Sequence, residues 1–280
     1  MRRRTYRHVS VGYVLVDVFL VLALLLWLFP LYMALLNSFK TNGELFTNIL
    51  AFSEHPTFDN YVRAYQKMQY GRSLLNTVFL TALGVFLIVA FSSVAGWALC
   101  RTKTKLSNII LKFFIFSMLI PFSAIMIPLY KIVTAFHFRN SLAGLSLIYA
   151  GLGVSMAIFL YHGFVKGIPY EIEEAALVDG CNKFQVFFHV VFPLLKPITA
   201  TVVITNALWI WNDFLLPLIV LSDRKTYTLL LSTNTLFGQY SNDWTSILSA
   251  LILSALPVII FYLFFQKKIL AGITSGALKG

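Results

Sequence analysis

Six long apolar stretches, separated by shorter and more polar segments, dominate the pattern of hydrophobic and polar positions along this chain. They cover residues 11–36, 74–99, 109–130, 142–164, 198–221 and 247–265. A helix needs about 20 residues to cross a hydrocarbon layer about 30 Å thick, and each stretch can provide them. The pattern predicts an all-α membrane protein with six transmembrane helices, in which residues 1–280 form a single transmembrane domain.

The first stretch follows a basic start, Met1-Arg2-Arg3-Arg4, and in this respect resembles a secretory signal peptide. Its apolar run is longer than the roughly 7–15 residues of a signal peptide, and no small-x-small cleavage site ends it. We therefore expect a retained transmembrane helix.

Small residues recur inside two of the stretches, where they allow neighbouring helices to approach closely. Ser92 and Gly96 lie one turn apart in 74–99, and three glycines, Gly144, Gly151 and Gly153, fall in 142–164. We expect these positions to mark helix–helix contacts.

The composition agrees with a chain that lies mainly in lipid. Hydrophobic residues make up 59% of it and charged residues 12%, whereas a soluble domain averages about 45–50% and about 25%. The net charge of +11 does not indicate nucleic-acid binding, because the basic residues lie in short segments between apolar stretches. Two distant cysteines, Cys100 and Cys181, are too few for a metal site or a disulfide framework.

The distribution of basic residues predicts the orientation of the chain, because Lys and Arg are retained on the cytoplasmic side. With the N-terminus inside, 13 of them fall in inner segments: Arg2, Arg3, Arg4, Arg7, Arg101, Lys103, Lys105, Lys166, Lys183, Lys196, Lys267, Lys268 and Lys279. The outer segments hold 8: Lys40, Arg63, Lys67, Arg72, Lys131, Arg139, Arg224 and Lys225. Both termini are therefore expected in the cytoplasm.

The inner connection at 165–197 is too long for a simple turn and begins with the pattern of a short helix. Pro169 is followed by three glutamates, Glu171, Glu173 and Glu174, as is typical of a helix start. Ile172, Ala175 and Ala176 form a narrow stripe of mostly small side chains. Gly180 stands where a C-terminal glycine cap is expected, in the left-handed conformation.

A second short helix is predicted directly after this glycine. Asn182 and Gln185 have the spacing of a capping box. A helical stripe follows, formed by Phe184, Phe187, Phe188 and Val191, and Pro193 and Pro197 are expected to end the pattern.

The first of these helices has the features of a protein-docking element. Its small residues allow a partner backbone to come close, and four acids, Glu171, Glu173, Glu174 and Asp179, can pair with Arg or Lys of the partner. The alternative is a helix that lies on the membrane surface, but such helices usually carry Lys and Arg on their polar face.

This connection resembles the EAA loop of ABC importer permeases. The family pattern is EAA, three residues, Gly, nine residues and Ile-x-Leu-Pro, and it is matched here by Glu174-Ala175-Ala176, Gly180 and Val190-x-Phe192-Pro193. Further segments resemble the carbohydrate branch, and above all the smaller membrane subunit of maltose-type systems: Asn37-Ser38-Phe39-Lys40, Asp59-Asn60-Tyr61, Ile127-Pro128-Leu129-Tyr130, Trp211-Asn212-Asp213-Phe214 and Gly276-Ala277-Leu278-Lys279-Gly280.

The resemblance implies a binding-protein-dependent importer of a sugar in a bacterial or archaeal cytoplasmic membrane. It implies four kinds of partner: a second, different permease subunit, a cytoplasmic ATPase dimer, an external solute-binding protein and the saccharide itself. The EAA loop would be the coupling helix seated on the ATPase. The residues expected to dock there are Glu171, Glu174, Ala175, Ala176, Asp179, Gly180 and Pro193.

The chain itself is not expected to be an enzyme or to bind a cofactor. No Gly-x-x-x-x-Gly-Lys-Ser/Thr sequence occurs in it, so ATP and Mg²⁺ are expected on the separate ATPase subunit. An intramembrane enzyme would need catalytic polar pairs within the apolar stretches. A stand-alone secondary transporter or channel is the alternative, and it would show buried midplane charges or an internal repeat.

Polar residues within the apolar stretches are candidates for function. Asp213 lies close in sequence to Asn206, Trp209, Trp211 and Asn212, and this group suits a sugar. Aromatic rings stack on the C–H face of a sugar, and a carboxylate accepts hydrogen bonds from its hydroxyl groups. The alternative is an interfacial aromatic belt with an acid that reaches water.

Asp17 and the outer segment 222–245 are two further features of the sequence. We expect Asp17 to pair with a neighbouring helix or subunit. The long outer segment 222–245 either contacts the solute-binding protein or is a solvated connector.

Overall fold

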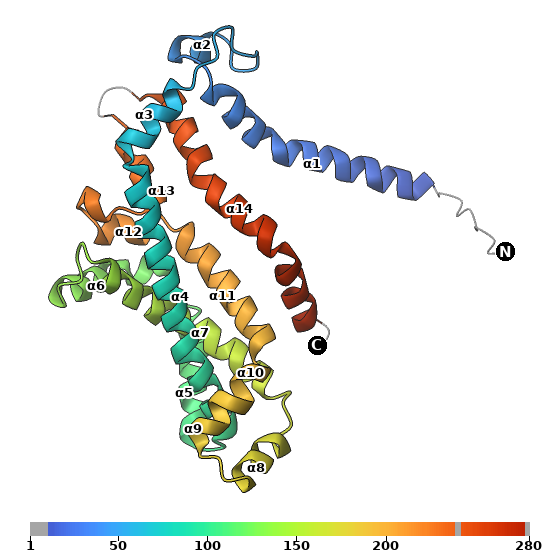
Figure 1. The fold of residues 1–280 in the computed structure, drawn as a ribbon. Coiled ribbons are helices and arrows are strands. Elements are labelled where there is room, and N and C mark those ends of the chain that lie inside the picture. Colours follow the sequence, from blue (N-terminus) through green and yellow to red (C-terminus); the bar gives the residue numbers. More distant parts are fainter. Residues whose placement is uncertain (1–10, 239–241, 278–280) are drawn as a thin grey trace. The chain divides into compact units, whose positions relative to one another are not determined.

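The computed structural model describes residues 11–238 and 242–277, and in this part of the chain the secondary structure is entirely helical (Figure 1). The α-helices are α1 (Val11–Ser38), α2 (Asn42–Thr47), α3 (Asp59–Lys67), α4 (Tyr70–Arg101), α5 (Lys105–Ser117), α6 (Phe122–Ala135), α7 (Leu142–Val165), α8 (Glu171–Val178), α9 (Lys183–Gln185), α10 (Phe192–Leu194), α11 (Lys196–Trp211), α12 (Leu215–Val220), α13 (Leu229–Ser232) and α14 (Trp244–Ala277). A π-helix, Val186–Val191, and two 3₁₀ turns, Arg224–Thr226 and Thr233–Leu236, complete the described elements.

The chain divides into two compact units, which are described separately below. The first comprises Met1–Lys67 and Thr235–Leu253, and the second comprises Met68–Asn234 and Ser254–Gly280. Helix α14 begins in the first unit and continues in the second.

Four of the six predicted spans are confirmed as helices. Helices α1, α4, α7 and α14 each contain one predicted stretch and are long and apolar enough to cross a membrane. Two bent helix pairs, α5 with α6 and the segment 183–194 with α11, raise the number of possible spans to six if each pair counts as one.

The prediction of one continuous helix over 109–130 is wrong. Helix α5 ends at Ser117, α6 begins at Phe122, and their axes differ by 105°. Pro121 explains the break, because a proline lacks the amide hydrogen and disfavours helical geometry in the residue before it. Pro121 itself is extended, with φ −66° and ψ 141°, and caps α6.

The prediction of one helix over 198–221 is also wrong. Helix α11 ends at Trp211, and α12 begins at Leu215. Asp213 explains this interruption, because its Oδ1 accepts hydrogen bonds from the amides of Leu215 (3.0 Å) and Leu216 (3.4 Å). A side-chain acceptor of this kind starts a new helix at the expense of continuing the old one.

In the second unit, α4 packs mainly against α7, and α11 packs against both (Figure 1). Gly96 and Gly153 lie at close approaches, as predicted. A Cβ atom added to Gly96 would lie 2.6 Å from Tyr161 Cβ, and one added to Gly153 would lie 2.6 Å from Ile88 Cδ1. Gly151 does not mark a contact within the described residues, because no heavy atom of a neighbouring element among them lies within 4 Å of the corresponding position.

These two kinds of glycine give a stability prediction. Gly96→Ala is expected to lower the free energy of unfolding by about 1–3 kcal/mol, because the added methyl group forces α4 and α7 apart. Gly151→Ala is the matched control and should leave stability unchanged or slightly raised, since alanine favours the helix. Denaturant titration of the purified protein in lipid bicelles measures both, and equal effects would contradict the packing described.

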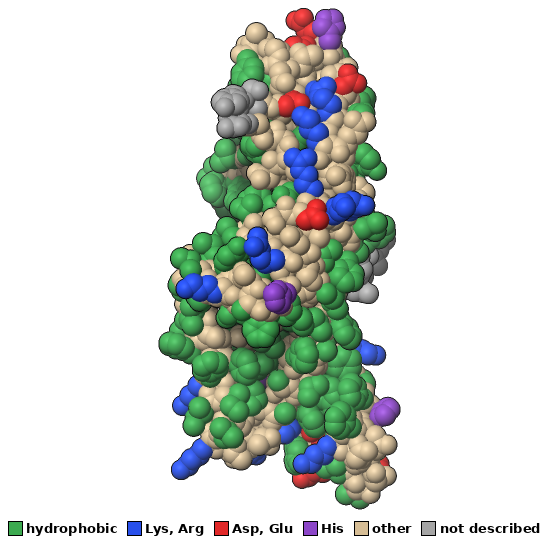
Figure 2. All heavy atoms as spheres, turned by 90° about the vertical axis from the view of Figure 1, so that its left-hand side faces the viewer, with side chains coloured by type: hydrophobic (Ala, Val, Ile, Leu, Met, Phe, Trp, Pro, Cys, Tyr) green, Lys and Arg blue, Asp and Glu red, His purple; other side chains and the backbone are tan. Residues whose placement is uncertain are grey.

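The outer surface of the second unit is largely apolar. Figure 2 shows hydrophobic side chains over much of the lower half of one face, with several Lys and Arg side chains near its lower edge. Exposed large side chains on α5 and α6 include Leu106, Ile109, Phe113, Phe116, Ile127 and Ile132. Such a surface is stable in contact with lipid or another apolar chain.

In the first unit, α1 is apolar on all sides, and nearly all its described side chains are exposed from Gly12 to Tyr32. A helix of this kind is typical of a membrane span. Asp17 has no hydrogen-bond or ion-pair partner among the described residues, so the expected pairing within the chain is not found there.

Candidate functional site

The predicted helix start after Pro169 is confirmed as α8, with Glu171, Glu173 and Glu174 in its first turn. The helix ends at Val178. Gly180 then adopts a φ of +88°, the left-handed conformation expected for a glycine cap, and no atom lies within 4 Å of a Cβ placed there. The turn therefore needs glycine for its backbone geometry and not for space.

Glu173 does not belong to the exposed acids of α8, contrary to the sequence-based interpretation. Its side chain is 3% exposed and lies against the end of α4. Trp97 Nε1 donates to Glu173 Oε2 (2.9 Å), and Arg101 Nε donates to Glu173 Oε1 (2.7 Å). Arg101 Nη2 also donates to the carbonyl of Ile168 (2.9 Å). The Trp97–Arg101–Glu173 cluster therefore fastens α8 to α4.

The remaining charged residues of α8 face outward. Glu171, Glu174 and Asp179 are exposed together with Ala175, while Ala176 is half-buried against the core. Three large apolar side chains, Ile172, Leu177 and Val178, are exposed beside them, and Val178 is 87% exposed. We call the exposed residues Glu171, Ile172, Glu174, Ala175, Leu177, Val178 and Asp179 the α8 surface.

The second predicted helix of this connection begins and ends where the sequence indicates. The amides of Asn182 and Gln185 each bond to the other's side chain, at 2.8 and 2.9 Å, so the capping box is confirmed. The helical segment 183–194 ends between Pro193 and Pro197, and a bend of 75° separates it from α11. Pro193 lies exposed near the start of α10, directly after the π-helix, where a missing amide is tolerated.

The predicted aromatic stripe of this second helix is divided between the core and the surface. Phe187 and Val191 are buried, and the Phe187 ring lies 5.2 Å from that of Trp97. Phe184 and Phe188 are exposed and stack on one another. The buried half supports the cluster that holds α8, and the exposed half adds apolar area to this end of the unit.

The candidate path residues near Asp213 are only partly brought together. Tyr149 is fully buried on α7, and its hydroxyl donates to Asp213 Oδ2 (2.8 Å) while its ring meets Trp209 edge-on. Asp213 is half-buried, and Trp209 and Asn212 are exposed. Asn206 is buried deeper in α11, where its Nδ2 donates to the carbonyl of Val202 (2.8 Å).

Trp211 lies apart from this group. It lines a cavity of about 310 Å³ between α4, α11 and α14, whose walls are apolar except for Thr81. The Thr81 hydroxyl is buried and has no hydrogen-bond partner among the described residues. The two tryptophans therefore face different surroundings, although they are two residues apart.

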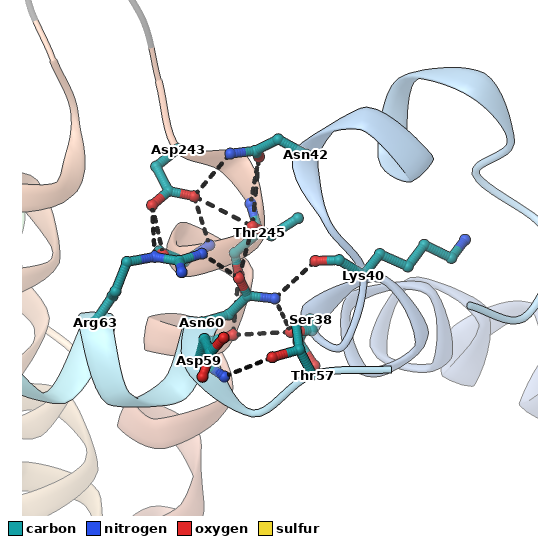
Figure 3. Close-up of polar contacts among 11 residues, drawn as sticks. Ser38, Lys40, Asn42, Thr57, Asp59, Asn60, Arg63, Asp243 and Thr245 are labelled. Carbon is teal, nitrogen blue, oxygen red and sulfur yellow. Dashed lines mark hydrogen bonds and ion pairs between the residues drawn. The ribbon is translucent and has the colours of Figure 1, made fainter. Parts of the chain in front are cut away.

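A polar network in the first unit joins two of the family-like segments, residues 37–40 and 59–61, to the start of α14 (Figure 3). Asn60 is fully buried, and its Nδ2 donates to the carbonyls of Ser38 and Lys40, both at 2.7 Å. Its Oδ1 accepts from Arg63 and from the Thr245 hydroxyl. Asn60 thus ties the end of α1, the start of α3 and the start of α14 together.

Two carboxylates of this unit are strongly stabilised in the ionised form. Partial burial of Asp243 opposes ionisation, but hydrogen bonds from Ser246 and Asn42 and the charge of Arg63 lower its pKa to about 2. Hydrogen bonds from the amide of Thr41, the Ser53 hydroxyl and the amides of His55 and Glu54 lower the pKa of Glu44 to about 2 as well.

No sequence signal links Glu173 with Trp97 and Arg101, because the partners lie more than 70 residues apart. The i, i+4 spacing of Trp97 and Arg101 places them on one helix face, but it does not name their partner. The hydrogen bond from Tyr149 to Asp213 could not be predicted either, because these two residues are 64 positions apart.

Comparison with known proteins identifies the family to which this chain belongs. The family model described as "Binding-protein-dependent transport system inner membrane component" matches residues 88–274. The chain belongs to this family, and it is a multi-pass membrane protein.

Individual relatives align over nearly the whole chain. One is the probable starch degradation products transport system permease protein AmyC of Thermoanaerobacterium thermosulfurigenes, 42% identical over 91% of this chain and 93% of that protein. Another is the melibiose/raffinose/stachyose import permease protein MelC of Bacillus subtilis, 35% identical over 90% and 91%. The fold is similar to that in a crystal structure of a bacterial ABC transporter that imports the polysaccharide alginate, with a TM-score of 0.80 at 22% identity, covering 95% of this chain and 99% of that one.

Proposed function

We propose that this chain is a permease subunit of an ATP-driven, solute-binding-protein-dependent importer and forms part of the path of a sugar or oligosaccharide across the cytoplasmic membrane of a bacterium or archaeon. The observation that carries this proposal is the 42% identity, over nine-tenths of both chains, to a permease named for starch degradation products. The family description and the similarity to MelC support the same function.

For the topology we propose six membrane spans with both termini in the cytoplasm. Four spans are α1, α4, α7 and α14, and the bent pairs supply the other two. This arrangement forms a single transmembrane domain over residues 1–280, and it leaves the α8 surface in the cytoplasm with the basic residues that flank it.

We further propose that the α8 surface is the coupling element that docks on the ATPase. Its exposed acids, Glu171, Glu174 and Asp179, suit basic groups of a partner, while Ala175 allows close approach. Gly180 sets the turn behind it, Ala176 packs against the core beneath it, and the exposed Pro193 completes the proposed docking residues.

The remaining partners follow from this assignment. ATP and Mg²⁺ are bound by the separate ATPase dimer, and this chain is not an enzyme. A second, different permease subunit completes the path and is a candidate partner for Asp17. The solute-binding protein delivers the saccharide on the outer side, where segment 222–245 is a candidate contact.

The proposed path residues are Asn206, Trp209, Trp211, Asn212 and Asp213. Trp209, Asn212 and Asp213 form the centre of the proposed path. Asp213→Asn and Trp209→Ala are expected to change the relative uptake of different saccharides by about tenfold, because each removes a group that a hydroxyl or a sugar face contacts. Trp211→Ala should change the relative uptake of saccharides less, because the cavity beside Trp211 is apolar and offers a saccharide only the Thr81 hydroxyl. A loss of assembled complex with unchanged selectivity would favour the aromatic-belt interpretation instead.

Uptake of labelled saccharides by the complex reconstituted in vesicles tests the function as a whole. Import is expected only with ATP inside, the ATPase subunit present and the binding protein outside. Import by this chain without the ATPase would support a stand-alone transporter or channel and refute the proposal.

A further inference from the structure

A polar cavity lies at the end of the second unit that carries α8. It has a volume of about 440 Å³ and is bounded by the last turn of α4, the first turns of α5 and the last turn of α7. Its polar lining comes from Arg101 and Lys103, from Asn108, and from His162 and Lys166. Three separate helices thus direct polar side chains toward one cavity.

The cavity has an excess of positive charge. Arg101, Lys103 and Lys166 contribute three cations, and Glu173 is the acid beside them. That carboxylate is already engaged by Arg101 and Trp97. Neither Lys103 nor Lys166 has an acidic partner among the described residues, so both ammonium groups remain available to an anion.

His162 adds a further polar group to the lining from α7. The residue is 8% exposed, its side chain lines the cavity, and neither ring nitrogen has a hydrogen-bond partner in the described part of the chain. The ring nitrogens are not among the fully buried unpaired atoms, so they remain accessible from the cavity. An acceptor oxygen placed in the cavity can therefore take a hydrogen bond from the ring N–H.

An apolar track continues from the cavity along α5. Its apolar side chains are Leu111, which also lines the cavity, and Ile115 one turn further on, and they share a helix face with Asn108 and Lys112. Ile115 is 37% exposed on this face, and Lys112 adds a further cation. A ligand with an anionic head and an apolar tail would contact both the basic cavity and this track.

We propose that this cavity binds the phosphodiester headgroup of an anionic membrane lipid, whose acyl chain lies along the α5 face. The side of the membrane rests on the proposed function, which places this end of the unit in the cytoplasm. Basic pockets between membrane helices on that side are suited to anionic headgroups. Free phosphate carries the same anionic oxygens as the headgroup, but it has no acyl chain to contact the apolar residues of α5.

The test compares lipid binding by the full complex in detergent, measured by native mass spectrometry. Phosphatidylglycerol is expected to stay bound where phosphatidylcholine does not. K103Q/K166Q should weaken phosphatidylglycerol binding about 30-fold, because each lysine near an anionic surface contributes about fivefold. Both lysines are exposed, so the fold should persist. K131Q/K225Q removes two exposed cations elsewhere and should bind as the wild type does.

Three outcomes would overturn the proposal. These are unchanged phosphatidylglycerol binding by K103Q/K166Q, equal loss in K131Q/K225Q, and displacement of the lipid by millimolar inorganic phosphate, which would indicate a site for a soluble anion. Co-purification of the ATPase is measured in parallel. Loss of the ATPase in K103Q/K166Q would indicate that the partner protein fills the cavity, whereas ATPase retention with lipid loss separates this site from the docking function.

Discussion

Neutralising one partner of the buried Arg101–Glu173 pair, as in Glu173→Gln, is expected to lower saccharide uptake about 100-fold or more, because breaking a buried pair leaves an uncompensated charge. The pair fastens α8 to the end of α4, so under the proposed docking we expect movement of α8 to reach α4 through it. The number of saccharides imported per ATP hydrolysed should fall while the ATPase still co-purifies. Both quantities are measured in the same vesicles.

Two further variants separate this linkage from a general loss of stability. Exchange of the charges, Arg101→Glu with Glu173→Arg, should restore part of the uptake. It should not restore all of it, because Trp97 Nε1 then has no carboxylate to donate to. Glu54→Gln removes an exposed acid in the first unit and should import normally. Full uptake by Glu173→Gln, or no rescue by the exchange, would contradict the proposed linkage.

Gly180→Leu is the second change with a large expected effect. A φ of +88° disfavours any side chain by about 1–2 kcal/mol, so the end of α8 is expected to rearrange although nothing obstructs the new side chain. Membrane insertion should remain, ATPase co-purification should weaken by about tenfold, and uptake should be lost.

Gly180→Asn is the matched control for this prediction, because asparagine adopts the left-handed conformation more readily than leucine. It is expected to retain most of the ATPase binding and uptake, as measured by co-purification and vesicle import. Equal behaviour of the leucine and asparagine variants would show that the conformation at this position has no role in docking.

The parts of the fold that depend on local signals could be predicted from the sequence. The helical stretches follow from the length of the apolar runs, and the ends of α8 and the start of α9 follow from Pro169, Gly180 and the capping box of Asn182 and Gln185. Each of these signals acts within a few residues, so it can be recognised without knowledge of the packing.

The parts that depend on long-range contacts could not be predicted in this way. The hydrophobic run continues through 118–121, and apolar residues resume directly after Asn212 and Asp213, so the length of the apolar stretches alone hides both breaks. Glu173 looks like its neighbours in sequence and is buried only because Trp97 and Arg101 meet it. The separation of Trp209 from Trp211 likewise follows from the packing of α7 and α14.

The central claim is that the α8 surface lies in the cytoplasm against an ATPase. It is tested most directly by a photoreactive amino acid in place of Val178, which is 87% exposed on that surface. Illumination of the assembled complex should attach position 178 to the ATPase subunit, and the same probe in place of Phe52 in the first unit should not. Attachment of position 178 to the solute-binding protein, or labelling of this position by a membrane-impermeant reagent from outside, would contradict the account.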